Sequence, residues 1–199
     1  MGDFMANTPK ILAFAGSARK DSFNKKLLNI AAAAARDVGA DADVTVIDLA
    51  DYPLPIMDQD LEAEVGVPEN ARKLKDLFGE HQGLLIAAPE YNSSITPLLK
   101  NAIDWVSRPE PGIPRLHYIS GKYAALLSAS PNPLGGMRGL VALRMMLGNI
   151  GVTVLPDTFS LRDAGSAFAP GGRLTDAVHD KAARGVGAAL ANTLTKLLD

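Results

Sequence analysis

Short apolar runs alternate with longer amphipathic or alanine-rich segments along this chain of 199 residues. The apolar runs have the length of strands, and the longer segments repeat apolar residues at the spacing of one helix face. The predicted strands are residues 10–15, 43–47, 83–88, 123–128 and 152–155. The predicted helices are residues 22–38, 69–81, 97–107, 137–149 and 175–198. Strands and helices are therefore expected to alternate along the chain.

Two helix ends carry sequence signals. Gly39 fits the position just beyond the first predicted helix, where a left-handed residue ends a helix. Thr96-Pro97 fits an N-cap followed by proline in the first turn of the third helix. The longer connections are expected to be loops, at residues 48–68, 108–121 and 161–173. The last is rich in glycine, alanine and proline, and it could be mobile or could cover a partner subunit.

Alternating strands and helices predict a parallel sheet with helices on both faces. Strands that are buried on both sides should be continuous apolar runs, and "GLLIAA" and "AALLSA" are of this kind. Five such strands favour a three-layer α/β fold, a doubly wound parallel sheet of the flavodoxin-like order 2-1-3-4-5. The length is that of one domain, so residues 1–199 are expected to form a single domain.

Composition argues against several classes of function. The net charge is −2 and no basic block is present, which argues against a nucleic-acid partner. The chain has no cysteine, which excludes disulfides and thiolate catalysis, and its three histidines are too scattered to predict a metal site. No apolar run approaches the roughly 20 residues of a membrane helix, and the opening segment lacks a signal-peptide core. We therefore expect a cytoplasmic protein without membrane insertion.

In an open α/β sheet, ligands bind beyond the carboxyl ends of the strands, where the strand order reverses. The loops "GSARKDSFN", "PEYNSSITP" and "SASPNPLGG", which follow the first, third and fourth strands, should meet there. The first leads into a helix N-terminus, which favours an anion. Donors in this loop are Ser17, Arg19, Ser22 and Asn24. Four hydrogen bonds to a phosphate give about 6 kcal/mol, whereas micromolar binding needs about 8, so the ligand should also have an apolar part.

Each loop also has a simpler interpretation. The first could be a polar surface turn with a serine N-cap, and it is neither a Walker A motif nor a G-x-G-x-x-G turn. The second offers an aromatic ring, an amide and backbone groups that can pair with a heterocycle, but it could equally be a turn before a capped helix. The prolines and glycines of the third allow close backbone approach, yet they are also typical of turns.

Taken together, three segments carry a family resemblance. "GSARKDSFNKKLL", "PEYNSSITPLLKNAIDW" and "GKYAALLSASPNPLGGMRGLVALRMMLGNIG" resemble, in order and spacing, the NADPH-dependent FMN reductase family. The resemblance implies bound FMN, with NADPH or NADH as reductant. The residues that match the family's phosphate loop are Ser17, Arg19, Ser22, Phe23 and Asn24. Those that match the loop holding its isoalloxazine ring are Pro89, Glu90, Tyr91, Asn92 and Ser93, and Ser130 matches its cofactor contact after the fourth strand.

The second segment departs from many relatives, which have S-[IV]-P-G-x-L-K-N where this chain has "SITPLLKN". Leu98 is expected to add bulk near the approach to the ring. Asp104 and Trp105 are expected to serve packing or subunit contact rather than chemistry. Arg138 could contact a phosphate of the nicotinamide nucleotide, or it could lie at an interface or on the surface.

The function implied is hydride transfer from NADPH or NADH through FMN to a small-molecule acceptor such as a quinone, free flavin, an azo dye or a metal oxyanion. FMN carries the chemistry, so no catalytic side chain and no metal ligand are assigned. The alternative is a flavodoxin-type carrier of single electrons, against which the small net charge argues, because such carriers are strongly acidic. A phosphorylated receiver module would need an aspartate after the third strand, where this chain has Ala88-Pro89. The resemblance also implies a homodimer or homotetramer, with residues 48–68 and 161–173 as candidate contacts.

Overall fold

The computed structural model describes residues 8–38 and 42–198. Its main sheet contains β1 (Lys10–Ala15), β2 (Asp43–Asp48), β3 (Gly83–Ala87), β6 (Tyr123–Ala129) and β7 (Thr153–Leu161), and a separate hairpin is formed by β4 (Glu90–Tyr91) and β5 (Ser94–Ile95). The helices are α1 (Phe23–Asp37), α2 (Gln59–Val65), α3 (Glu69–Glu80), α4 (Pro97–Val106), α5 (Met137–Asn149), α6 (Ala164–Ala167) and α7 (Ala177–Leu198), with a 3-10 turn, η1, at Leu49–Asp51. The predicted strands and helices are present with ends within two residues, except at the end of β7.

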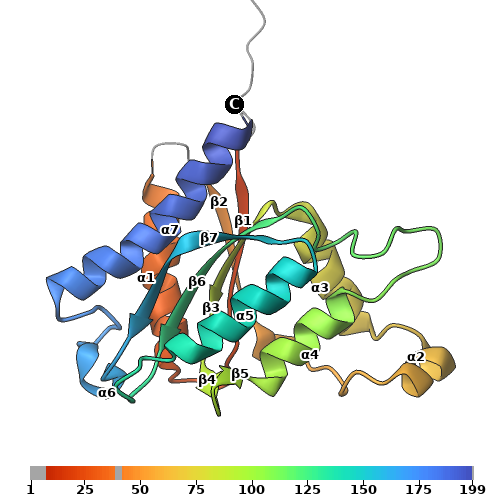
Figure 1. Ribbon diagram of the computed structural model, residues 1–199, viewed down its shortest axis with the longest axis horizontal. Coiled ribbons are helices and arrows are strands. Elements are labelled where there is room, and N and C mark those ends of the chain that lie inside the picture. Colours follow the sequence, from red (N-terminus) through yellow and green to blue (C-terminus); the bar gives the residue numbers. More distant parts are fainter. Residues whose placement is uncertain (1–7, 39–41, 199) are drawn as a thin grey trace, which may run out of the picture.

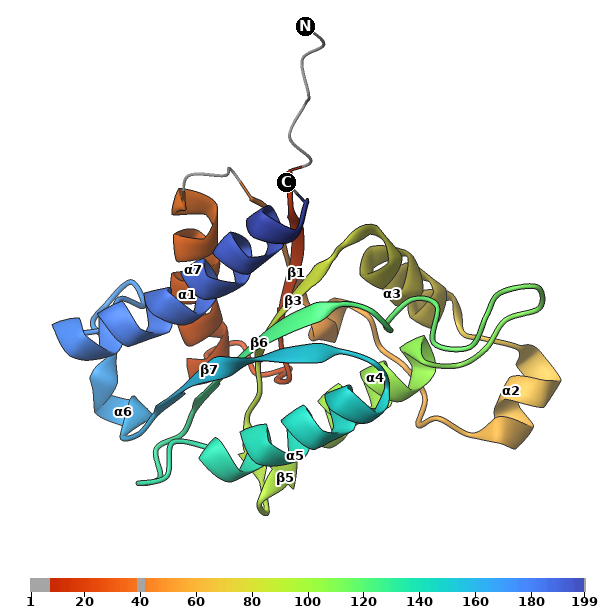
Figure 2. The same cartoon turned by 45° about the horizontal axis from the view of Figure 1, so that its top comes forward.

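All strands of the main sheet run parallel, in the order β2-β1-β3-β6-β7. Because β6 and β7 are the fourth and fifth strands of this sheet, the predicted flavodoxin-like order is confirmed. Helices α1 and α7 cover one face, and α3, α4 and α5 cover the other (Figures 1 and 2). The hairpin of β4 and β5 lies at the edge where the parallel strands end (Figure 1).

The core lies on both faces of the sheet, as β1 shows. Ile11 is buried on the side of α1 and α7, whereas its neighbour Leu12 is buried on the side of α3, α4 and α5. The alanine-rich stretch of α1 lets α7 approach closely, since a Cβ at Gly187 would lie only 2.0 Å from the Ala31 carbonyl oxygen. Small residues on both helices therefore bring α7 down onto α1 and close this side of the core.

Strand β7 continues to Leu161, well beyond its predicted end at residue 155. Pro156 interrupts the apolar run, and the register with β6 shifts at this point. The Arg144 guanidinium donates to the carbonyl oxygens of Val154, Leu155 and Pro156, at 2.9, 2.6 and 3.3 Å. Because β7 is an edge strand, a proline is tolerated in it, and Arg144 satisfies the carbonyls that the irregular stretch leaves unpaired.

The predicted loop at 48–68 contains η1 and α2 and is anchored to α4. Trp105 Nε1 donates to the Pro55 carbonyl oxygen at 2.8 Å. Asn101 donates to the same oxygen at 2.8 Å and accepts from the Met57 N–H at 2.8 Å. Trp105 is fully buried, so its expected packing role is confirmed.

The predicted cap of α4 is present, because Thr96 Oγ1 accepts from the Leu99 N–H at 3.3 Å and Pro97 opens the helix. The helix end predicted at Gly39 lies outside the described residues. None of the helices within residues 8–38 and 42–198 is both long and apolar enough to cross a membrane.

Candidate functional site

Loops from three strands meet at the carboxyl edge of the sheet and line one pocket of about 110 Å³. The turn after β1, the hairpin after β3 and the loop after β6 all contribute. The lining residues are Ser17, Arg19, Ser22, Phe23, Asn24, Pro89, Glu90, Tyr91, Ala129, Ser130 and Pro131. Of the residues predicted to contact a cofactor, Asn92 and Ser93 do not line this pocket and lie at the exposed turn of the hairpin.

The turn after β1 is held from two sides. The Gly16 N–H donates to the Ala87 carbonyl oxygen at 2.9 Å, and the Gly16 carbonyl oxygen accepts from Thr96 Oγ1 at 2.7 Å. A Cβ at Gly16 would lie 3.0 Å from Leu99 Cβ, so this contact leaves little room for a side chain. Thr96 therefore caps α4 and tethers the first loop. Leu98 is partly buried against the core and does not line this pocket, and its expected bulk near the approach to the ring stays a prediction.

Asn24 joins the first loop to the third. Its Nδ2 donates to the Ala129 carbonyl oxygen at 2.8 Å, and its Oδ1 accepts from the Ala129 N–H at 3.0 Å. The side chain is buried. One Nδ2 hydrogen and the Oδ1 are thus bonded within the protein, and they fix the N-terminus of α1 against the end of β6. The second Nδ2 hydrogen is the donor that the predicted contact with an anion would use.

The remaining donors lie around the first turn of α1. Ser22 is the N-cap, and its Oγ accepts from the Lys25 N–H at 3.4 Å, which leaves its hydroxyl proton available to a ligand. Ser17 Oγ accepts from the Arg19 N–H at 3.3 Å and has a hydroxyl proton in the same way. The first N–H groups of a helix have no partner within the helix, so they add further donors at this point.

Charges around the first turn of α1 are only partly paired. Lys25 forms an ion pair with Asp48, and Lys26 forms one with Asp21. The hydrogen bond from Lys26 holds the pKa of Asp21 below its ordinary value. Arg19 is exposed, and no carboxylate among the described residues pairs with it. The positive end of the helix and this guanidinium, which lies 6.0 Å from the centroid of the Phe23 ring, together favour an anion in the pocket.

The segment at 161–173 packs on the same loop within one chain. Phe168 stacks on Phe23 with ring centroids 6.0 Å apart and parallel planes. Lys26 Nζ lies 5.7 and 5.8 Å from the centroids of these two rings. The expected loop thus includes α6 and an aromatic contact that covers the flank of the first loop.

The second loop is a tight hairpin rather than an irregular loop. Its central residues, Asn92 and Ser93, have φ values of 50° and 66°. Two consecutive positive φ values are typical of a type I′ turn, which connects antiparallel strands with the correct twist. Tyr91 is 56% exposed beside the pocket. The hairpin therefore presents an aromatic surface at a well-defined place.

In the third loop, the glycines allow close packing against the end of β7 and the start of α5. Gly135 has a φ of 61°, and a Cβ there would lie 2.9 Å from backbone atoms of Ser160 and Leu161. Gly136, with a φ of 91°, is the N-cap of α5. The Ser130 N–H donates to the Leu161 carbonyl oxygen at 3.0 Å, which ties the loop to the end of β7.

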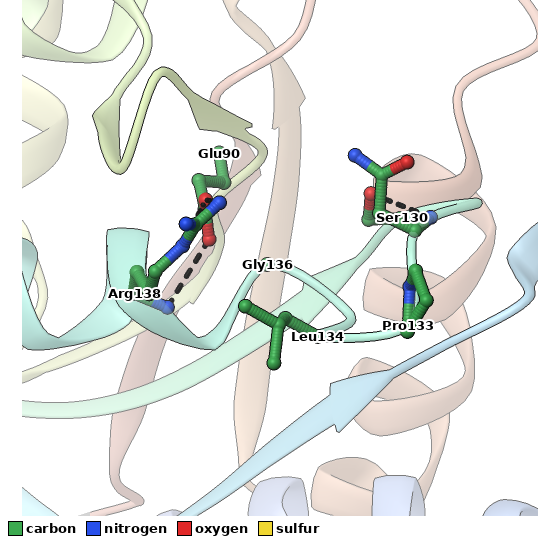
Figure 3. Close-up of a pocket in the computed structure, with 7 residues that line it drawn as sticks. Glu90, Ser130, Pro133, Leu134, Gly136 and Arg138 are labelled. Atoms are coloured by element: carbon green, nitrogen blue, oxygen red, sulfur yellow. Dashed lines mark hydrogen bonds and ion pairs between the residues drawn. The ribbon is translucent and has the colours of Figure 1, made fainter.

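A second pocket of about 240 Å³ adjoins the first, and Glu90 and Ser130 line both. Figure 3 shows Glu90 and Arg138 pointing toward each other on one side of this pocket. Glu90 Oε1 accepts from Arg138 Nε at 2.8 Å, and Oε2 accepts from the N–H groups of Arg138 and Gly139 at 3.1 and 3.3 Å. Glu90 thus caps α5 as well as pairing with Arg138. Sequence reasoning missed this role, because nothing local to Glu90 indicates a helix that begins far along the chain.

Within the described residues, His, Asp and Glu side chains do not gather in groups of three that could hold a metal ion. The first pocket instead combines a helix N-terminus, hydroxyl groups and a free arginine with an exposed tyrosine and nearby backbone groups. This combination suits a phosphate monoester joined to a flat ring system.

Comparison with known proteins agrees with this geometry. The profile of the family "NADPH-dependent FMN reductase" matches residues 9–166. The NAD(P)H-dependent FMN reductase of Pseudomonas aeruginosa is 36% identical over 175 residues, which are 86% of this chain and 88% of that protein. The NAD(P)H:quinone oxidoreductase of Solanum tuberosum is 37% identical over 137 residues, 69% of this chain and 66% of that protein.

A solved structure with the same fold is a flavoenzyme NAD(P)H:(acceptor) oxidoreductase from Paracoccus denitrificans. It superposes with a TM-score of 0.78 at 29% identity, and the match covers 95% of this chain and 98% of that one.

Proposed function

This chain belongs to the NADPH-dependent FMN reductase family, and from that premise we propose that it passes electrons from NADPH or NADH through bound FMN to a quinone. The observation that carries the proposal is the pocket at the carboxyl edge of the sheet, where the loops after β1, β3 and β6 meet beside the N-terminus of α1. In this proposal, residues 1–199 form one FMN-binding domain.

The residues present fit FMN. Its phosphate would lie at the N-terminus of α1, where Ser17, Ser22 and Arg19 surround the first helical N–H groups. Phe23 would form the wall beside this group, and Asn24 holds the start of the helix in position while its second amide hydrogen remains for the phosphate. The ring would lie against the hairpin, near the exposed Tyr91, with Pro89, Glu90 and Ser130 as further contacts from the pocket. Asn92 and Ser93, at the turn of the hairpin, would contact it from outside the pocket.

Bound FMN would supply the redox chemistry, which is hydride transfer between the nicotinamide nucleotide and an acceptor. The role of the protein would be to bind FMN and to orient it. Backbone N–H groups of the hairpin and of the loop after β6 would stabilise negative charge on the ring, as an oxyanion hole does. We assign no side chain as acid or base.

A quinone is the acceptor class that the relatives favour. The potato relative is named an NAD(P)H:quinone oxidoreductase, and a protein of Pseudomonas putida with 32% identity over 174 residues is named a quinone reductase. Free flavin, an azo dye and a metal oxyanion are further candidate acceptors, and the same assay tests them. We propose the cytoplasm as the place of this reaction.

We also propose that the protein is a homodimer or homotetramer in which the second half of α5 forms the contact, so that Arg138 in the first turn lies outside it. Along α5, Val141 and Met145 are each 67% exposed and lie one turn apart. A groove of about 560 Å³ runs beside them toward α4, and Lys100 and Asp104, which pair at 2.7 Å, stand at its edge. Apolar residues flanked by one charge of each sign suit a two-fold contact, in which the same surface meets itself.

The test begins with the visible absorbance of the purified protein, before and after incubation with FMN and removal of the free cofactor. We expect a yellow protein that NADPH bleaches under nitrogen and that a quinone restores. Steady oxidation of NADPH with a quinone supports the enzyme, whereas bound FMN without any nucleotide oxidation would favour the electron carrier instead. A protein that retains no FMN would refute the proposal.

A further inference from the structure

We propose that Arg138 binds a phosphate group of the nicotinamide nucleotide and that Glu90 holds it in position to do so. This inference rests on the proposed function. It concerns the second pocket, which adjoins the FMN pocket and shares Glu90 and Ser130 with it.

Glu90 is a fixed anchor. It lies on β4 and its side chain is only 8% exposed. One carboxylate oxygen accepts from two backbone N–H groups at the start of α5, and the other accepts from Arg138 Nε at 2.8 Å and pairs with one terminal nitrogen of the guanidinium. The carboxylate is therefore held by the hairpin on one side and by α5 on the other.

Arg138 is much more exposed than Glu90, with 54% of its side chain accessible. Its Nε and one Nη are bonded to Glu90, while the other Nη has no hydrogen-bond partner among the described residues. A guanidinium offers five N–H donors in a rigid plane, and this one is bound along one edge only. The remaining donors are available to an oxyanion without breaking the pair with Glu90.

The local charge favours an anion despite the ion pair. Glu90 offsets the guanidinium, but its other oxygen also faces the positive end of α5, which is equivalent to roughly half a charge. The other lining residues, Ser130, Asn132, Pro133, Leu134 and Gly136, are neutral. The pocket is therefore left with a net positive end. Leu134, which is 45% exposed, gives apolar surface beside it, so a ligand with both a phosphate and a ribose or ring fits.

A nicotinamide nucleotide has two kinds of phosphate that could meet Arg138. The pyrophosphate is common to NADPH and NADH, whereas the 2′-phosphate is present in NADPH alone. Arg138 would bind either phosphate through the same kind of hydrogen bond, so a comparison of NADPH with NADH shows which of the two it contacts.

The experiment measures the reductive half-reaction by anaerobic stopped flow, following loss of the FMN absorbance against nucleotide concentration. Arg138→Ala should raise the half-saturating concentration about tenfold and change the limiting rate less than twofold, because one charge-assisted contact at a half-exposed site is lost. A rise for NADPH alone identifies the 2′-phosphate, and a rise for both nucleotides identifies the pyrophosphate. Arg138→Lys, which retains the charge but not the planar fork, should fall between the wild type and Arg138→Ala.

The matched control is Arg184→Ala, because Arg184 is also about half exposed and paired with a carboxylate, Asp180, but lies on α7. Half-saturation within twofold of wild type for both nucleotides in Arg138→Ala, or an equal shift in Arg184→Ala, would overturn the inference. If Arg138→Ala does not fold, Arg138→Lys carries the same comparison. If the wild type binds FMN but oxidises neither nucleotide, the proposed function fails and this inference fails with it; if the wild type reacts normally, only the inference is at stake.

Discussion

Replacing Asn24 with alanine should reveal how firmly the FMN-binding loops are held together. The buried amide makes two hydrogen bonds to the Ala129 backbone, at 2.8 and 3.0 Å. Asn24→Ala leaves both backbone groups of Ala129 without these partners. Each unsatisfied group costs about 1–3 kcal/mol, and water entering from the adjoining pocket should offset part of the sum. We therefore expect the free energy of unfolding to fall by about 2–4 kcal/mol.

Urea unfolding of the FMN-free protein measures this loss, and fluorescence titration with FMN measures the effect on the site. Asn29→Ala is the control, since Asn29 is exposed on the same helix and alanine has a higher helix propensity. Its free energy of unfolding should change by less than about 0.5 kcal/mol, and its FMN affinity should not change. Asn24→Asp adds a further distinction. The carboxylate retains the acceptor for the Ala129 N–H but turns its other oxygen toward the Ala129 carbonyl oxygen in a buried position, so it should lose at least as much stability as alanine, and its charge should weaken phosphate binding more.

The reasoning is refuted if Asn24→Ala and Asn29→Ala unfold at the same urea concentration. If Asn24→Ala loses stability but binds FMN as tightly as the wild type, the claim that Asn24 positions the FMN-binding loops is refuted. The first result would mean that water replaces the amide completely, and the second that the first and third loops hold their positions without it.

Two further predictions concern stability and assembly. Burial lowers the pKa of Lys122 to about 8, so the unfolded chain binds more protons than the folded one between about pH 8 and 10, and stability should rise with pH across that window. Lys122→Met should remove this rise. Near neutral pH the variant should be more stable than wild type by about 1–2 kcal/mol, because it loses the roughly 3 kcal/mol cost of the buried charge but also the hydrogen bond to the His81 carbonyl oxygen. Urea unfolding near pH 7 and near pH 10 checks both expectations. Met145→Glu should lower the molar mass measured by light scattering, whereas Val178→Glu, an equally exposed apolar position on α7, should not; equal masses for Met145→Glu and wild type would remove α5 from the contact.

The sheet could be predicted because its strands are buried on both faces. In β3 every residue is buried, and an apolar run as short as this favours a strand over a helix. The second half of β7 was missed because it lies at the edge of the sheet, where Pro156 and exposed polar residues break the apolar pattern. Helix α2 was missed because it buries none of its residues, and its N-cap, Asp58, was the one signal that could have shown it.

The sequence predicted which loops meet at the candidate site but not which hydrogen bonds each of their side chains makes. Motifs placed the correct loops at one edge, yet the partner of Asn24 lies 105 residues along the chain and that of Glu90 lies 48 residues along. Nothing near either residue shows that its polar atoms are bonded inside the protein. Only the folded arrangement separates side chains that hold loops together from side chains that remain free for a ligand.

That separation has a consequence for how the protein would respond to substitution. Three tethers fix the edge of the sheet: Thr96 holds the first loop to α4, Asn24 holds it to the end of β6, and Glu90 holds the hairpin to α5. A cofactor that carries its own chemistry needs such fixed surroundings more than it needs reactive side chains. Changes at Thr96 or Asn24 should therefore act on FMN affinity and stability. Arg138 lies beyond the tethers with part of its guanidinium unbonded, so its replacement should act on the choice and affinity of the nucleotide.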